Sequence, residues 1–172
     1  MCIRDSLEQA SEGGVYVENN LVTSPGRDRG MVFQQFSLFP WLTVKENVMF
    51  GLQDQYPDKV RREEKALVWV ERVGLVEFVD YYPNQLSGGM QQRVAIARAL
   101  APGPKVLLMD EPFAALDAQT RSRMQRHLLE IWRELNITVV FITHDLEEAV
   151  LLADKIFVLA PKPGRLVATL PI

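Results

Sequence analysis

Two patterns of apolar and polar residues alternate along the second half of the chain. Continuous apolar runs at 106–109 and 138–142 predict buried strands. Between them, apolar residues recur at a helical spacing, which predicts a long helix over 118–135. The apolar positions of this helix are Met124, Leu128, Ile131 and Leu135. Strand–helix–strand alternation of this kind predicts a parallel sheet of the α/β class.

The pattern continues towards the end of the sequence with shorter elements. Asp145 is predicted to begin a further helix, with Glu148 as its capping-box partner. Two short strands are expected at 156–159 and 166–170, joined by a Pro-Lys-Pro-Gly turn at 161–164. Such a pair predicts a small antiparallel β element beside the main sheet.

The first half begins with strand-like residues and then becomes helical. Residues 13–36 are strand-like at 15–17 and 30–33, with a Pro-Gly turn at 25–26 between them. Thr43 is a suitable cap for a short helix that runs to Phe50, because Glu46 stands three residues later as a capping-box partner.

Two further helices are predicted before the second half begins. The first covers 58–73 and is expected to end at Gly74. Its apolar face is formed by Val60, Leu67, Val70 and Val73. The second begins at Ser87 and ends near Ala101, where two prolines follow.

Composition limits the kind of protein. The chain has 172 residues, 48% of them hydrophobic, with a net charge of −3, which suits one soluble globular domain and disfavours nucleic acid as a partner. Its single cysteine, Cys2, excludes an internal disulfide and fits a reducing cytoplasm. No run of about 18 apolar residues is present to cross a membrane.

Asp110 and Glu111 are the first candidates for chemistry. They follow a predicted parallel strand, and open α/β sheets bind their ligands at the carboxyl ends of strands. Asp110 can hold Mg²⁺, and Glu111 can act as a general base towards water. The alternative is a solvated acidic pair that only ends the strand before Pro112.

Ser87, Gly88 and Gly89 form a second candidate site at a helix start. The first N–H groups of a helix have no partner within the helix, and glycines let a phosphate approach them. The serine hydroxyl adds a donor. The alternative is an ordinary serine cap, which is a common feature of helices.

The whole string from Leu86 to Leu100 reads Leu-Ser-Gly-Gly-Met-Gln-Gln-Arg-Val-Ala-Ile-Ala-Arg-Ala-Leu. Together with Asp110-Glu111 it resembles the signature motif and the catalytic strand of ABC-type ATPases. The resemblance implies a P-loop NTPase-like parallel sheet flanked by helices, with an inserted helical subdomain. It implies ATP and Mg²⁺ as cofactors.

The resemblance assigns roles to further residues of the chain. Gln34 matches the glutamine that reaches the metal and the attacking water, and His144 matches the switch histidine that contacts the γ-phosphate. Asp117, in Ala-Leu-Asp, matches a loop that faces a second subunit. In such a homodimer Ser87 would contact ATP held by the partner. Taken alone, a glutamine after an apolar strand says little, and a histidine at a strand end is usually structural. Asp117 could also simply cap the helix that follows it.

The same resemblance implies partners and a location. Residues 38–44 read Leu-Phe-Pro-Trp-Leu-Thr-Val and match the region that docks on transmembrane permease subunits. The stretch at 25–34 resembles the nitrate, sulfonate and taurine importer branch. These features imply an importer subunit on the cytoplasmic face of the membrane, which serves a solute-binding protein indirectly.

The family pattern also divides the chain into three parts and exposes one departure. A β-rich core part is expected at about 7–36, a helical subdomain at about 37–103 and a catalytic core part at about 104–172.

No G-x-x-x-x-G-K-[ST] phosphate loop occurs in the sequence. We therefore expect an N-terminally incomplete ABC domain that is inactive alone, with residues 1–6 resembling a foreign junction.

Two other functions remain open at this stage. Soluble ABC ATPases that act on DNA or ribosomes share Leu-Ser-Gly-Gly and Asp-Glu, although the long coiled coil and the paired cassettes typical of them are not predicted here. A non-catalytic remnant is the third possibility, which ATP turnover would test.

Overall fold

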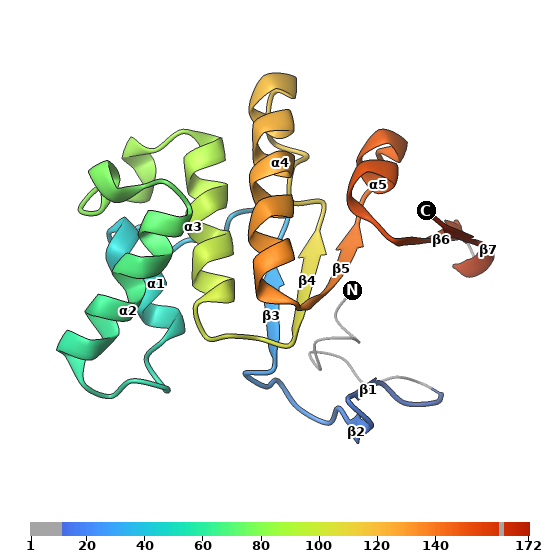
Figure 1. Ribbon diagram of the computed structural model, residues 1–172, viewed down its shortest axis with the longest axis horizontal. Coiled ribbons are helices and arrows are strands. Elements are labelled where there is room, and N and C mark those ends of the chain that lie inside the picture. The colour runs from blue at the N-terminus through green and yellow to red at the C-terminus, as the bar shows by residue number, and fades with distance from the viewer. Residues whose placement is uncertain (1–11, 162–163) are drawn as a thin grey trace.

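Figure 1 shows a computed structural model of the protein, and the structure describes residues 12–161 and 164–172. Cys2, the junction at 1–6 and two residues of the turn at 161–164 therefore lie outside the described residues.

Three parallel strands form the centre of the molecule. They are β3 (Arg29–Val32), β4 (Val106–Asp110) and β5 (Thr138–Ile142), in the order β3-β4-β5. In the register, Val32 pairs with Met109 and Asp110 with Ile142, so the three strands end at one edge. The predicted parallel α/β sheet is confirmed.

A helical layer lies on one side of β3, as the left half of Figure 1 shows. It contains α1 (Val44–Gly51), α2 (Lys59–Arg72) and α3 (Gly88–Leu100), with short 3₁₀ turns η2 (Val76–Phe78) and η3 (Pro83–Gln85) between the last two. Thr43 caps α1, and the predicted capping box with Glu46 is present.

The buried face of α2 differs from the predicted one. Val60 and Leu67 are 67% and 40% exposed, whereas Ala66 and Val70 are fully buried. The helix packs on α1 and α3 through a narrower stripe than its apolar residues suggested. Sequence periodicity gives the apolar positions of a helix but does not decide which of them meet a neighbour.

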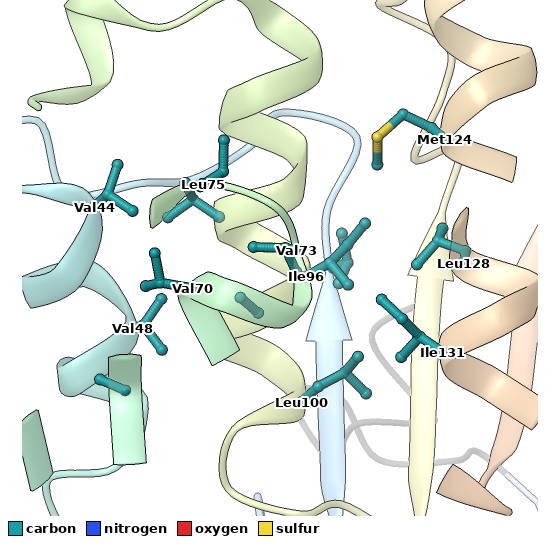
Figure 2. Close-up of a cluster of buried hydrophobic side chains, with 14 of the residues drawn as sticks. Val44, Val48, Val70, Val73, Leu75, Ile96, Leu100, Met124, Leu128 and Ile131 are labelled. Atoms are coloured by element: carbon teal, nitrogen blue, oxygen red, sulfur yellow. The ribbon is translucent and has the colours of Figure 1, made fainter. Parts of the chain in front are cut away.

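Apolar side chains from four helices meet in one core (Figure 2). Val48 of α1 faces Val70 of α2, while Ile96 of α3 lies on the side of the helical layer nearer the sheet (Figure 2). The long helix α4 (Ala118–Leu135) contributes the buried residues Met124, Leu128 and Ile131, as predicted. Each fully buried aliphatic side chain stabilises the fold by about 1.5–3 kcal/mol.

Three smaller elements complete the described chain: the helix α5 (Leu146–Leu152) and two antiparallel hairpins. The hairpins pair β1 (Tyr16–Val17) with β2 (Asn20–Leu21), and β6 (Lys155–Ala160) with β7 (Arg165–Pro171). The second is the antiparallel β element expected from the sequence.

The capping box predicted for α5 is wrong, although its cap is right. The Asp145 side chain accepts hydrogen bonds from the backbone N–H groups of Glu147 and Glu148. The Asp145 backbone N–H, however, donates to the Thr143 hydroxyl at 3.0 Å instead of to Glu148. Glu148 is buried and accepts a hydrogen bond from Gln125 of α4 at 3.0 Å.

None of the helices described in 12–161 and 164–172 has both the length and the apolar composition that a bilayer crossing requires.

Candidate active site at the carboxyl edge of the sheet

The backbone turns sharply where β4 ends. Glu111 follows the last strand residue, Asp110, and has a φ of 43°, in the left-handed region. Its N–H donates to the Ile142 carbonyl of β5 at 2.8 Å, which holds the turn in place. Such a conformation costs a non-glycine residue on the order of 1–3 kcal/mol and is concentrated at functional sites. Asp110 and Glu111 are both partly buried here.

Three of the predicted site residues meet at this turn. Gln34, which follows β3, donates its side-chain N–H to Glu111 Oε2 at 3.3 Å. The imidazole Nδ1 of His144, which follows β5, lies 3.2 Å from Glu111 Oε1. Each of the three parallel strands therefore supplies one side chain, and the carboxylate lies between an amide and an imidazole.

A small cavity of about 60 Å³ opens beside the carboxylate. Its lining includes Glu111, Phe113, Thr143, His144 and Asp145. A cavity of about 10–15 Å³ is enough to hold one water molecule. The site therefore has room for water within reach of a base, while the His144 side chain is 77% exposed towards solvent.

The predicted phosphate-contacting residues begin α3 and form a separate group. The Ser87 hydroxyl accepts a hydrogen bond from the Met90 N–H at 3.3 Å, so its local role as a cap is confirmed. Ser87 is exposed, and the α3 dipole places partial positive charge beside it. A Cβ at Gly88 would lie 3.6 Å from Phe36, in ordinary contact, whereas one at Gly89 would clash with Thr120.

Asp117 caps α4, as the sequence suggested for its local role. Its carboxylate accepts hydrogen bonds from the N–H groups of Gln119 at 3.1 Å and Thr120 at 3.0 Å. The hydrogen bond with the Thr120 side chain is the main cause that lowers the pKa of Asp117, and the backbone hydrogen bonds lower it further. The residue is exposed, and its contact with a second subunit stays a prediction.

The sequence also matches a family model described as "ABC transporter" over residues 3–114. The chain belongs to this family. Among its relatives, the nitrate import ATP-binding protein NrtD of Synechocystis sp. is 52% identical over 96% of this chain and 62% of its own length. The taurine import ATP-binding protein TauB of Pelagibacter ubique is 50% identical over 91% of this chain and 59% of its own length. The chain thus spans less than two thirds of these relatives.

Solved ABC structures share the fold. The dimeric post-hydrolysis state of the ATP-binding cassette MJ0796 bound to ADP and Pi aligns with a TM-score of 0.77 and 38% identity, over 91% of this chain and 72% of that one. The protein cbiO1 from Clostridium perfringens, part of the ABC transporter complex cbiONQ, aligns with a TM-score of 0.86 and 29% identity, over 98% and 69% of the two chains.

Sequence reasoning missed one residue that joins α3 to the segment after Gln34. Arg98 of α3 donates to the carbonyls of Ser37, at 2.9 Å, and Phe36, at 3.4 Å, and its guanidinium covers the Phe39 ring. Burial lowers the pKa of Arg98. The contact with Ser37 joins positions 61 residues apart, so no local pattern could have revealed it.

Proposed function

We propose that this chain is part of the ATP-binding and ATP-hydrolysing subunit of an ABC-type importer. The observation that carries the proposal is the convergence of Gln34, Glu111 and His144 at one edge of the sheet. The relatives named as import ATP-binding proteins support it. The proposal concerns the whole protein, of which this chain spans a part.

The geometry suits each residue to one task in phosphoryl transfer to water. Glu111 would accept the proton of the attacking water, because its carboxylate borders a cavity that can hold one. His144 would donate to the γ-phosphate, since its imidazole is exposed next to that carboxylate. Gln34 would orient the water or a metal-bound ligand from the opposite side.

Asp110 and Gln34 would hold Mg²⁺ at the same site. The Gln34 amide nitrogen points to Glu111, which leaves its oxygen for a hard cation, and Asp110 adds a carboxylate. Among the residues that the structure describes, no cluster of three or more His, Cys, Asp and Glu side chains forms a metal site. Mg²⁺ usually keeps several waters and binds one or two carboxylates together with the phosphates. The ion would neutralise phosphate charge in the reaction.

Ser87, Gly88 and Gly89 would complete the site of a second copy of the subunit. They begin a helix, as anion-binding backbone groups often do. The dimeric state of the ADP-bound cassette supports an arrangement of this kind. In it, Asp117 would face the partner.

Transmembrane permease subunits are the proposed partners on the membrane. The surface around Trp41, which is 70% exposed, would receive them on the cytoplasmic face. The relatives named for nitrate and taurine import make a small solute with an anionic group the proposed cargo, delivered by a solute-binding protein. Within the subunit we retain the division into core parts at about 7–36 and 104–172 and a helical subdomain at about 37–103.

The alternative of an ATPase acting on DNA or ribosomes has no comparable support. The relatives reported above are import proteins, and the net charge of −3 does not favour nucleic acid.

The test uses the chain joined to an upstream segment that carries a phosphate loop. We expect Mg-ATP turnover in this protein, and a loss on the order of 10²-fold or more in Glu111→Gln, because the amide keeps the shape and loses the base. ATP binding, measured by equilibrium dialysis, should be retained.

Glu134→Gln is the matched control, because Glu134 is an exposed glutamate on α4, away from the cavity. No turnover in the wild-type protein would count against the proposed function and favour the non-catalytic remnant. Turnover that survives in Glu111→Gln would exclude this residue as the base.

A further inference from the structure

Arg121 lies in the first turn of α4 and contacts two different loops. Its Nη1 lies 3.2 Å from Asp145 Oδ2, in the loop that carries His144. Its Nη2 donates to the Leu116 carbonyl at 3.3 Å, in the loop that carries Asp117. One guanidinium therefore joins the loop proposed to face a second subunit to the loop of the proposed phosphate-sensing imidazole.

The helix itself does not favour a cation at this position. The start of a helix carries partial positive charge, so Arg121 needs compensation from elsewhere. Asp145 and the Leu116 carbonyl supply it, and they hold a side chain that is only 32% exposed. A planar guanidinium held by two acceptors has little freedom to turn. A shift of one acceptor would therefore move the guanidinium and, with it, the other acceptor.

The contacts of Asp145 restrict the position of His144, the residue before it in the chain. One carboxylate oxygen accepts the N–H groups of Glu147 and Glu148, the other faces Arg121, and the Asp145 backbone N–H donates to the Thr143 hydroxyl. His144 is thus held between two residues that are bonded to each other. With the backbone on both sides fixed, the orientation of the His144 imidazole determines its contact with Glu111.

We infer that Arg121 is a positioning residue that couples the loop at Leu116 and Asp117 to the contact between His144 and Glu111. Docking of a second subunit on Asp117 would then orient the imidazole against the carboxylate. The inference rests on the proposed function for its role in catalysis, but the coupling itself is a property of this chain.

The test reads the ring nitrogens of both histidines of the chain by NMR. Glu111→Gln defines the signals of His144 without its carboxylate partner. We expect Arg121→Met to move the His144 signals towards that state, and Arg121→Met combined with Glu111→Gln to add no further change. His127, on the same helix, lies 3.8 Å from Glu130 and is the internal reference, which should not move.

Two variants separate positioning from stability. Gln125→Leu breaks the neighbouring contact between α4 and Glu148 without touching Arg121, so it should lower the melting temperature and leave the His144 signals in place. Asp145→Asn keeps an oxygen for the α5 cap and weakens the ion pair, so it should reproduce the effect of Arg121→Met. Arg121→Lys should restore part of the wild-type signal, because it keeps the charge.

Unchanged His144 signals in folded Arg121→Met and Asp145→Asn would overturn the inference, as would an equal response in Gln125→Leu. In the protein with a phosphate loop, Arg121→Met should lower kcat by about 10- to 100-fold, the scale of a small misplacement, with KM nearly unchanged. Absence of any wild-type turnover would count against the proposed function alone and leave the NMR result to decide the coupling.

Discussion

At the scale of single residues, the two glycines at the start of α3 have different physical roles. A Cβ at Gly89 would lie 2.5 Å from Thr120 Cγ2 of α4, closer than real Cβ atoms approach. At Gly88 the nearest atom would be 3.6 Å away. Gly89 therefore permits the close packing of α3 on α4, whereas a Cβ at Gly88 would make only ordinary contacts with Phe36 and Leu116.

This difference predicts that replacement by alanine changes the free energy of unfolding differently at the two glycines. Gly89→Ala should lower the free energy of unfolding by about 1–3 kcal/mol, the usual cost of overpacking. Gly88→Ala should be neutral or slightly stabilising, since alanine is favoured in helices by about 1 kcal/mol over glycine. Urea denaturation measures both.

Thr120→Ser removes the clashing methyl group and should restore most of the stability in the Gly89→Ala background. Equal destabilisation by Gly88→Ala and Gly89→Ala would show that the contact with Thr120 is not the cause.

At the scale of elements, one buried side chain of α1 shapes the loop before it. Asn47 is fully buried, and its Oδ1 accepts the Phe39 N–H at 2.9 Å. Its Nδ2 donates to the carbonyls of Phe39, at 3.1 Å, and Leu42, at 2.9 Å. The loop that presents Trp41 is therefore fixed by a residue of the helix that follows it.

Asn47→Ala should leave several of these loop groups without partners. We expect a loss of about 2–3 kcal/mol in the free energy of unfolding, because an unsatisfied buried polar group costs about 1–3 kcal/mol. Asn84→Ala, at an exposed asparagine of η3, is the control and should change stability by less than about 0.5 kcal/mol. A loss in Asn47→Ala no larger than in the control would mean that the loop holds its shape without this side chain.

At the scale of the whole molecule, three aromatic side chains form an exposed surface beside the helical layer. The Phe39 ring lies 4.4 Å from that of Phe50 and 5.6 Å from that of Trp41, between ring centroids. Trp41 and Phe50 are 70% and 50% exposed. Arg98 links this aromatic surface to α3, the helix that begins after Ser87.

Trp41→Glu tests whether this aromatic surface docks on the permease. Because the side chain is exposed, the melting temperature and ATPase activity of the intact subunit should stay nearly unchanged. Co-purification with the permease and transport should both fall sharply, since an unpaired charge in an apolar contact costs several kcal/mol.

Val60→Glu is the matched control, because Val60 is 67% exposed on α2, outside the aromatic surface. If the Trp41→Glu subunit is folded and still binds its permease at wild-type affinity, Trp41 has no docking role.

Local interactions let the sequence alone predict much of this protein. The helix over 118–135, the strand over 138–142 and the caps at Thr43, Ser87 and Asp145 are confirmed. Periodicity and capping depend on residues a few positions apart, so short stretches of the sequence are enough to predict them. A strand end and a helix start singled out Asp110, Glu111 and Ser87 to Gly89, and the resemblance to a known family added Gln34, Asp117 and His144. The roles of these residues stay predictions.

The tertiary structure decided what depends on residues far apart in the chain. Gln34 and Glu111, which are 77 residues apart, meet only because β3 and β4 are neighbours in the sheet. Glu148 leaves its predicted cap role because Gln125 reaches it from another helix. Groups that are near in the sequence and groups that are distant in it compete for the hydrogen bonds of a polar side chain. Only the folded chain brings the distant groups within hydrogen-bond range.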